Sequence, residues 1–475
     1  MTPRKNKNLC QPPSPEPLRL TNPHAAGIDI HAAIHWVAVP PHDAPPPSPD
    51  HPRNVPAHVR SFGACTVDLI RLADWLTQCG VTTVVMESTG IYWIPLFELL
   101  ESRGFEVFLV DPRQSRHAPG RPKSDVLDCQ WLQRLHSYGL LTASFRPADQ
   151  VVVVRSYLRQ RQMLIRYAGQ HVQHMQKALE QMNVKLAEVV SDITGVTGMA
   201  IIQAILRGER DPRALAKLRN EHCKRTEADI ARALQGNWRA EHLFALQQAV
   251  ELQEFYRGQL RACDAQLQAQ LATFADRSQG QPRPPRQQRR ALQKRANDPK
   301  FEVGSALYRM AGVDLTVLEG IDETTALVIL SEIGLDVSRF PTAKHFTSWL
   351  GLCPQHQGSA GKIRSRRVRR GCNRAGRALR LAVQACHRAK HALGAFYRRI
   401  QARAGAPKAI VATARKLAER VYRLLKYGAD YVRQEVEAYE AAYQQRVVKG
   451  LTRRAAELGY KLERIVATEG TGAGT

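Results

Sequence analysis

"AAGIDIHAAIHWVAV", residues 25–39, is the segment from which the fold of the N-terminal part of this chain can be predicted. Its apolar and β-branched residues alternate with others, which predicts a strand or a β-hairpin. Asp29 lies inside the apolar run. Because successive side chains of a strand point to opposite faces, its carboxylate points away from Ile28 and Ile30. This acid, held on one face of a strand, is the first candidate site residue.

Strands and helices alternate from this stretch to residue 147. The apolar runs "VTTVVMES" and "FEVFLVDP" predict strands, and "TVDLIRLADWLTQCG", "LFELLESRG" and "KSDVLDCQWLQRLHSYGLL" predict helices. Residues 40–56 are rich in proline and predict a loop. The alternation predicts a mixed α/β sheet of about 120 residues.

A different pattern follows, with apolar residues spaced seven, three and four apart as in a heptad seam. They are Leu158, Ile165, Val172, Met175, Leu179, Met182 and Leu186, and later Leu260, Cys263, Leu267 and Leu271. Two long helices joined near "GERDPRALAKL" are expected. They form either an antiparallel hairpin within one chain or a coiled coil between two subunits.

The rest of the chain divides around a basic linker. Residues 277–299 combine Pro, Gln and seven basic residues, which predicts a mobile segment able to follow a phosphate backbone. "LEGIDETTALVILSEIG" then resembles a helix-hairpin-helix unit with a helix N-terminus at DNA phosphates. We expect residues 1–23 disordered, an α/β domain at 24–147, long helices at 148–276, the linker at 277–300, a largely helical domain at 301–464 and a flexible tail at 465–475.

The charge balance indicates a polyanionic partner. Lys and Arg number 69 against 43 Asp and Glu, for a net charge of +26. Nucleic acid is the first candidate for such a surface, and an anionic membrane is the weaker one. No apolar run approaches the roughly 20 residues that span a bilayer. Nine cysteines without a CxxC pair, and an N-terminus without an apolar signal, favour a reducing cytoplasm.

Three more carboxylates join Asp29 as a candidate metal site. Glu87 ends the strand "VTTVVME", and Asp125 and Asp128 share one face of a helix. If these acids converge at one sheet edge, their repulsion requires a hard cation, Mg²⁺ or Mn²⁺. Two such ions about 4 Å apart are a common clamp for phosphodiester chemistry. The alternative is that these four acids are ordinary edge and surface residues without a metal. Asp111 of "LVDPRQ" is another candidate for the metal site, although an Asp-Pro pair is also typical of a turn.

Ser359 in "GSAGK" is the candidate nucleophile. Its small neighbours let a phosphate approach closely, but a serine hydroxyl needs a base or an electrophile relieved of charge repulsion. The basic run after it can neutralise phosphate oxygens; its candidate nucleic-acid-binding residues are Lys362, Arg364, Arg366, Arg367, Arg369, Arg370 and Arg374. His356 is a candidate proton acceptor and Ser365 a second candidate nucleophile. The alternative is that Ser359 lies in a flexible loop before a basic helix that contacts DNA.

Three other patterns carry less weight. "HVQH" (171–174) lies inside the heptad helix without an acid ligand, so zinc is discounted. "HCKR" (222–225) matches the HxxR of tyrosine recombinases but lacks the partner residues. Tyr397 is expected to be a packing aromatic.

Taken together, "GIDIH", "VVMESTGIYW", "KSDVLDCQWLQRL", "FTSWLGLCP", "GSAGK" and "GCNRAGRALRLA" resemble a known family. The family consists of the DEDD transposases of insertion-sequence family one-hundred-and-ten, which are related to the Piv/MooV DNA invertases. The resemblance covers roughly residues 24–460. Two departures are the Ala360 that follows the serine, where the family usually has Gly, and the insertions at 40–56 and 277–299.

The resemblance implies an RNase H-like sheet, as in Holliday-junction resolvases, with Asp29, Glu87, Asp125 and Asp128 as a metal-binding tetrad. It implies a coiled coil between the domains, a dimer or tetramer, and Ser359 as the residue that forms a covalent phosphoserine link to DNA. It also implies a structured guide RNA that pairs with donor and target DNA, and a prokaryotic cell in which the protein lies near the nucleoid. The expected activity is that of a DNA transposase or recombinase; the alternatives are a metal-dependent structure-selective nuclease and a non-catalytic nucleic-acid scaffold.

Overall fold

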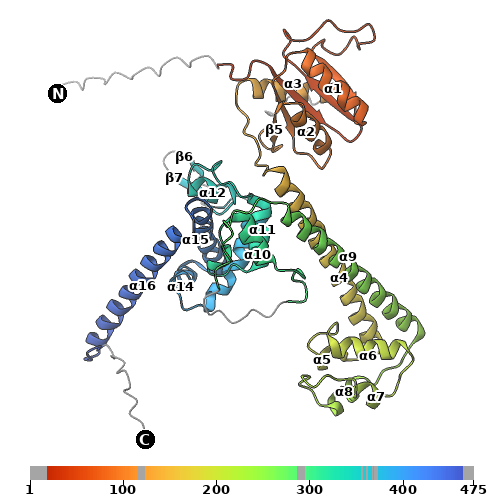
Figure 1. Cartoon of the computed structure of the whole chain (residues 1–475), viewed down its shortest axis with the longest axis vertical. Helices are drawn as coiled ribbons and strands as arrows, with labels where there is room; N and C mark the ends of the chain where they lie inside the picture. Colours follow the sequence, from red (N-terminus) through yellow and green to blue (C-terminus); the bar gives the residue numbers. More distant parts are fainter. Residues whose placement is uncertain are drawn as a thin grey trace, which may run out of the picture. The chain divides into compact units, whose positions relative to one another are not determined.

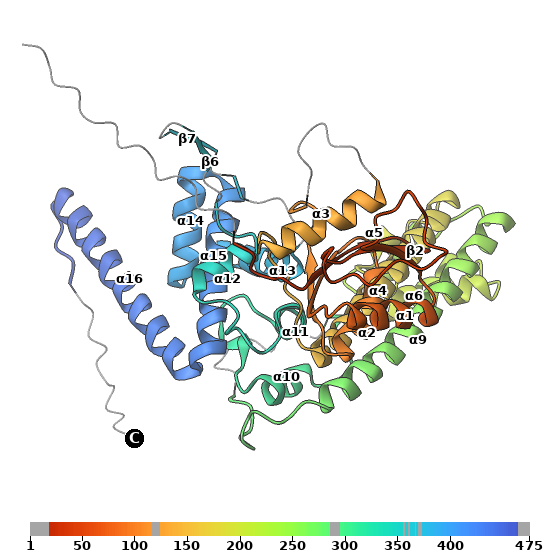
Figure 2. The same cartoon turned by 90° about the horizontal axis from the view of Figure 1, so that it is seen from above.

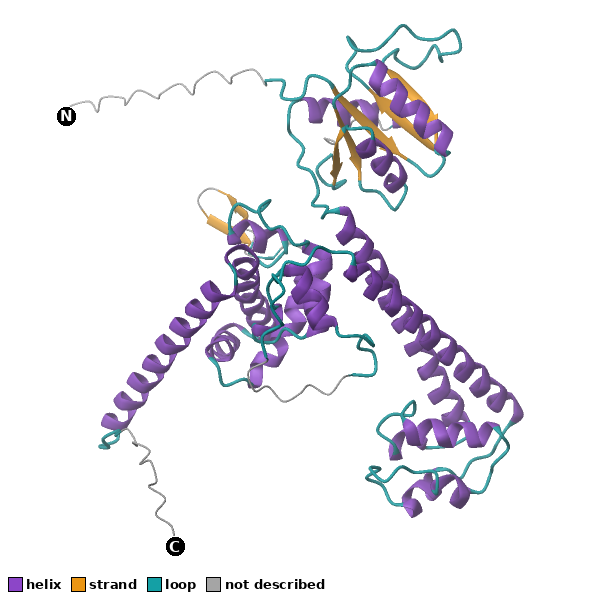
Figure 3. Ribbon diagram, in the orientation of Figure 1, coloured by secondary structure: helices purple, strands orange, loops and turns teal. Residues whose placement is uncertain are grey.

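A computed structural model describes residues 19–115, 124–285, 295–354, 357–359, 362–365, 367–368 and 373–463 of the chain. It divides into two compact units, Met1–Arg146 and Pro147–Thr475. The first holds a sheet, and the second is built from helices and one short β-hairpin (Figures 1 and 3).

The first unit is a five-stranded sheet in the order β3-β2-β1-β4-β5. Its strands are β1 (Ala25–Ile30), β2 (Ile34–Ala38), β3 (Val59–Gly63), β4 (Thr83–Glu87) and β5 (Glu106–Val110). β1 is antiparallel to β2 and parallel to β4, and β5 runs parallel to β4. The mixed α/β sheet expected from the sequence is confirmed, and its order is consistent with an RNase H-like domain.

Helices cover both faces of this sheet (Figure 2). They are α1 (Thr66–Gln78), α2 (Trp93–Ser102) and α3 (Asp125–Ser137). Ile28 and Met86 pack into a core with α1 and α2, whereas Val85 packs with Leu132 of α3 on the opposite face. Every helix expected here is present. β3 was not expected, because its sequence "VRSFG" lacks a clear alternation of apolar residues.

Gly27 sets the position of α3. A Cβ atom at this residue would lie 2.2 Å from the backbone nitrogen of Gln133 and 2.4 Å from the carbonyl oxygen of Cys129. The helix backbone therefore rests directly on β1, a contact that only glycine allows. Because α3 is seated two residues from Asp29, its first turn reaches the end of β1.

The second unit begins with two long helices, α4 (Asp149–Gln181) and α9 (Ala240–Ala272). They pack against each other within the chain, and they are antiparallel. Cys263 Sγ donates to Tyr157 O near one end at 3.3 Å, and His171 stacks on Tyr256 further along, with ring centroids 5.4 Å apart. The expected helical pair is therefore present, while a supercoil or a coil between subunits stays a prediction.

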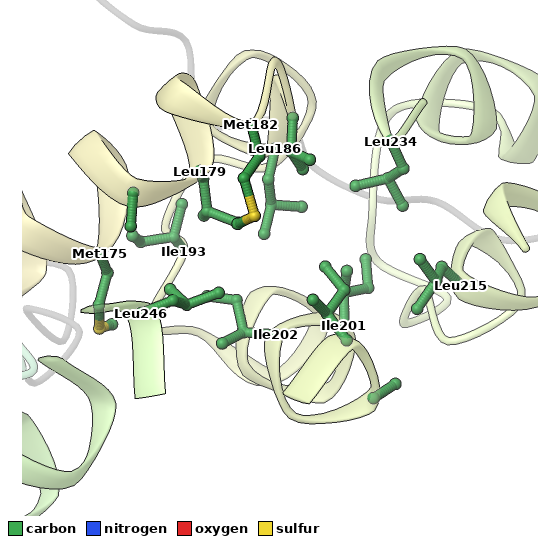
Figure 4. Close-up of a cluster of buried hydrophobic side chains, with 14 of the residues drawn as sticks. Met175, Leu179, Met182, Leu186, Ile193, Ile201, Ile202, Leu215, Leu234 and Leu246 are labelled. Carbon is green, nitrogen blue, oxygen red and sulfur yellow. The ribbon is translucent and has the colours of Figure 1, made fainter. Parts of the chain in front are cut away.

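A compact group of short helices joins α4 to α9, where the sequence indicated only a connection. They are α5 (Leu186–Val189), α6 (Val196–Leu206), α7 (Pro212–Ala216) and α8 (Glu227–Ala233). Met175, Leu179, Met182, Ile201 and Leu246 enclose their common core (Figure 4). The far end of the helical pair is thus a small packed body of its own.

The C-terminal part of the second unit is helical. Its elements are α10 (Val303–Ala311), η1 (Leu315–Val317), α11 (Glu323–Ile333), α12 (Ala343–Trp349), β6 (Gln357–Ser359), β7 (Lys362–Ser365), α13 (Arg374–Ala382), η2 (Val383–Arg388), α14 (Ala392–Ala404), α15 (Ala406–Tyr427) and α16 (Ala429–Glu457). It docks on α4 through Arg155, which donates to the carbonyl oxygens of Ser331 and Glu332 at 3.1 Å. Among the described residues, no helix is long and apolar enough to cross a membrane.

The start of the basic linker differs from its expected mobility. Arg277 N donates to Arg309 O at 2.8 Å. Arg283 forms ion pairs with Asp314 and Glu323, each at 2.7 Å, and its side chain is 15% exposed. This arginine neutralises acids of the same chain, so it is not available to a phosphate backbone. Residues 286–294, with more of the linker's basic side chains, lie outside the described residues.

Candidate active site

Two of the four candidate carboxylates lie on neighbouring strands. β1 and β4 are parallel, with Ile28 opposite Met86 in their register, so Asp29 and Glu87 occupy the next position along each strand. Gly27 and Val85, two residues earlier on each strand, face α3. Since side chains alternate along a strand, Asp29 and Glu87 face α3 as well.

The other two carboxylates lie in the first turn of α3, whose N-cap is Ser124, with Ser124 Oγ accepting from Leu127 N at 3.3 Å. Because the backbone of α3 packs directly against Gly27, the first turn of this helix lies toward Asp29. Asp125 and Asp128 both act electrostatically on Asp29. Three of the four acids therefore come together, and Glu87 is aligned with them by strand register.

His31 completes the centre of this cluster, and it is a residue that the sequence analysis did not single out. Its Nε2 lies 3.2 Å from Asp29 Oδ2 and 3.5 Å from Asp125 Oδ1. The signal that could have identified it is its position in "GIDIH", two residues after Asp29 and thus on the same face. Asp125 is 51% exposed and His31 48%, so the cluster is open to solvent on one side.

The local field opposes ionisation of Asp29. Burial raises the pKa of this carboxyl group; the nearby charge of His31 lowers it, and the like charges of Asp128 and Asp125 raise it further. The net direction is upward from 3.8. A divalent cation would reverse this balance, because it stabilises the ionised form of every nearby acid.

Glu87 is held by a second residue that sequence reasoning missed. Ser115 Oγ donates a hydrogen bond to Glu87 Oε1, and Ser115 O accepts from Trp131 Nε1 of α3 at 3.0 Å. Ser115 is buried, and it links the segment after β5 to the acid at the end of β4. Nothing in "DPRQS" indicates such a role, because a serine after a turn is common in any sequence.

The donor set fits a hard divalent cation. One ligand atom each from Asp29, His31 and Asp125 lies within 4.8 Å of the other two, a spread that one ion can bridge with bonds of about 2.0–2.6 Å. Glu87 and Asp128 can supply further oxygens. Asp111 instead accepts from Arg113 N at 2.9 Å and closes the turn after β5, which is the role expected of an Asp-Pro pair.

Ser359 lies at the end of a short β-hairpin. It is the last residue of β6 and pairs with Lys362, the first residue of β7. The backbone of Ser359 is therefore paired in a strand, while its role, as a nucleophile or as a DNA contact, stays a prediction. Ser365 pairs with Gln357 at the other end of the hairpin. The side chains of residues 355–366, and all of His356, Ala360 and Gly361, lie outside the described residues.

The candidate nucleic-acid-binding residues follow the hairpin. Lys362 and Arg364 lie in β7, and Arg366, Arg369 and Arg370 lie outside the described residues. Arg367 is exposed. Arg374 begins α13, where its Nη1 donates to Gln162 Oε1 of α4 at 3.0 Å. This contact places the start of the basic helix beside the long helical pair.

The N-terminus of α11 is capped by its own side chains, and a contact with DNA phosphates there stays a prediction. Asp322 caps it, with Oδ1 accepting from Thr325 N at 2.7 Å, and Glu323 occupies the first turn. Glu323 pairs with Arg283, and Asp322 lies 3.8 Å from Arg295, so side chains of the chain itself surround this helix N-terminus.

His171 of "HVQH" stacks on Tyr256 of α9. Tyr397 is buried within α14, as expected of a packing aromatic.

Comparisons with known proteins match both units of the chain. Residues 26–184 match the DEDD model described as "Transposase", and residues 314–398 match the "Transposase IS116/IS110/IS902 family". A relative, "Insertion element IS110 uncharacterized 43.6 kDa protein" of Streptomyces coelicolor, is 34% identical over 119 residues. That stretch is 25% of this chain and 29% of the relative.

The sheet and its acid-bearing edge agree with the match of residues 26–184 to the DEDD transposase model. Residues 26–184 and 314–398 are therefore similar to regions of DEDD transposases and of IS116/IS110/IS902-family transposases, respectively. The first region contains Asp29, Glu87, Asp125 and Asp128, and the second contains Ser359.

Proposed function

We propose that this protein cuts and joins DNA as the transposase of an insertion sequence, through a covalent link between Ser359 and a cleaved strand. The observation that carries the proposal is the meeting of acids from β1 and α3 around one point, with Glu87 in register beside them. Asp29, Glu87, Asp125 and Asp128 hold one or two divalent cations, Mg²⁺ or Mn²⁺.

The proposed chemistry is a phosphoryl transfer. Asp29, Glu87, Asp125 and Asp128 would hold a divalent cation, which when bound would supply charge stabilisation to the phosphate oxygens and the leaving oxygen. The oxygen of Ser359 forms a bond to phosphorus, the bond from phosphorus to the leaving strand breaks, and the serine proton passes to solvent while the leaving oxygen gains one. Rejoining is the reverse step with another strand as the nucleophile.

The basic residues supply the binding energy for this reaction. Lys362, Arg364, Arg366, Arg367, Arg369, Arg370 and Arg374 contact the phosphates on either side of the cleaved bond. The net charge of +26 suits two partners, donor and target DNA, and a structured guide RNA that pairs with both. Holding two duplexes requires more than one subunit, so the active form is a dimer or a tetramer.

Substitution of the tetrad tests this function. Asp29→Asn, Glu87→Gln, Asp125→Asn and Asp128→Asn should each lower the rate of strand cleavage by about a hundredfold or more, as loss of a charge-stabilising group does. The measurement is cleavage of a labelled element end by the full chain with Mg²⁺ or Mn²⁺. The matched control is Asp74→Asn, because Asp74 lies on α1, on the other face of the sheet.

Equal rates for the tetrad and control variants would show that the acid cluster takes no part in cleavage. The competing function is a structure-selective nuclease, in which the tetrad activates water and Ser359 only contacts DNA. The geometry of the acids is compatible with either chemistry, so the behaviour of a Ser359 variant separates the two functions.

A further inference from the structure

His31 occupies the position of an additional ligand at the acid cluster. It follows β1 directly, and its Nε2 lies 3.2 Å from an oxygen of Asp29 and 3.5 Å from an oxygen of Asp125. One ring nitrogen therefore contacts carboxylates from two different elements, a strand and a helix.

A hydrogen bond from this nitrogen cannot satisfy both carboxylates. The Nε2 atom of an imidazole carries either one hydrogen or one lone pair, so it can fully satisfy only one carboxylate oxygen. A cation placed between the nitrogen and the two oxygens would be bound by all three at once. The 4.8 Å limit on their mutual separations is compatible with such a shared ion.

We propose that His31 is a nitrogen ligand of the cation held by the tetrad, and that it makes the site favour Mn²⁺ and Co²⁺ over Mg²⁺. This inference rests on the proposed function, because it requires that the acids bind a cation. Sites made only of oxygen suit Mg²⁺, whereas an imidazole nitrogen favours transition-metal ions, in the order Mn²⁺ below Co²⁺. The tetrad sets the charge of the site, and His31 sets which ion it prefers.

A second histidine-containing group offers a matched control. In the described parts of the chain, His24, His42 and Asp43 also bring one ligand atom each within 4.8 Å of one another. Asp43 lies at the start of the proline-rich loop, and its carboxylate is 3.0 Å from His24 Nδ1 and 3.4 Å from His42 Nε2. A substitution there removes a histidine next to a carboxylate without touching the tetrad.

The test is Mn²⁺ binding to the full-length protein, followed by electron paramagnetic resonance with detection of nitrogen-14 coupling. The wild type should show coupling from a directly bound imidazole. His31→Gln should lose this coupling, and its Mn²⁺ affinity should fall about tenfold or more, the range seen when support around a metal is removed. Mg²⁺ affinity should change little, which also shows that the variant is folded. His24→Gln should keep both the coupling and the affinity.

The same measurements can contradict the role of His31 separately from metal binding by the tetrad. Nitrogen coupling that is absent in the wild type, or that persists in His31→Gln, would overturn the role of His31. If Asp29→Asn still abolished Mn²⁺ binding in that case, the proposed function would stand. If Asp29→Asn bound Mn²⁺ as the wild type does, the tetrad itself would fail, and His31 with it.

Discussion

Single residues set the geometry of the acid cluster, and Gly27 is the clearest case. Gly27→Ala should destabilise the first unit by about 3 kcal/mol or more, because its Cβ would meet the α3 backbone at 2.2 Å and the helix would have to move. Urea unfolding combined with hydrogen exchange of β1 and α3 measures this loss.

The control for that substitution is Gly169→Ala in α4. A Cβ there has nothing within 4 Å, and alanine is the better helix former by up to about 1 kcal/mol. The control should therefore stabilise α4 slightly. A Gly27→Ala protein with unchanged stability would show that α3 does not rest on β1.

Asp29 gives the first unit a pH-dependent stability. Burial, with the like charges of Asp128 and Asp125, raises its pKa in the folded protein above 3.8. The folded state then binds this proton more tightly than the unfolded chain does, so in a chelating buffer stability falls as pH rises from about 3.8 through the folded pKa.

Asp29→Asn removes this penalty. In the metal-free protein the variant should unfold at a higher urea concentration than the wild type at about pH 7, and the difference should vanish at about pH 4. Added Mn²⁺ should stabilise the wild type and leave the variant unchanged. A wild type that is the more stable of the two at neutral pH without metal would contradict the assigned environment of Asp29.

At the scale of elements, a buried ion pair joins the two long helices. Arg161 of α4 and Asp264 of α9 are 4% and 5% exposed, and Arg161 Nε lies 2.5 Å from Asp264 Oδ1. Asp264 Oδ2 also accepts from Lys300 N at 3.2 Å. This one acid thus ties the helical pair to the segment before α10.

Breaking this pair should cost much more than replacing it. Arg161→Met leaves a buried carboxylate without its cation, which should lower stability by about 3–5 kcal/mol, whereas the double variant Arg161→Met with Asp264→Leu should lose far less. Chemical unfolding of the second unit measures both. The exposed pair Arg453–Glu457 of α16 is the control, and Glu457→Gln should have little effect. Equal losses for the single and double variants would argue against a buried pair.

The sequence was sufficient for elements with strong periodicity and insufficient for those set by distant contacts. The alternation of residues 25–39 and the apolar runs before Glu87 and Asp111 predict β1, β2, β4 and β5, because half or fully buried strands need such patterns. β3 is recognisable only from its pairing with β2. The core of α5–α8 combines short segments that show no period by themselves.

The candidate site divides in the same way. Asp29, Asp125 and Asp128 could be proposed from their elements, since strand alternation and helical spacing fix the faces they occupy. His31 and Ser115 could not, because their roles depend on how α3 and the turn after β5 meet the sheet. Arg283 was misassigned to a mobile linker, since the acids that bind it lie 31 and 40 residues away.

At the scale of the whole molecule, DNA binding should depend steeply on salt, because phosphate contacts release counterions. Arg367→Gln and Arg374→Gln should each weaken binding and reduce the slope of log affinity against log salt by about 1. Arg103→Gln is the control, since Arg103 is paired with Asp74 on α1. Fluorescence anisotropy across a salt series measures the slopes, and identical slopes for all variants would remove these arginines from the interface.

The proposed covalent link between Ser359 and DNA can be detected by denaturing gel electrophoresis of the full chain after reaction with a labelled element end and Mn²⁺. A protein–DNA adduct that survives denaturation should form with the wild type and with Ser365→Ala. It should be absent with Ser359→Ala, and greatly reduced with Asp29→Asn or a chelator. Cleavage that continues in Ser359→Ala, with no adduct in the wild type, would contradict the covalent link and identify a metal-dependent nuclease instead.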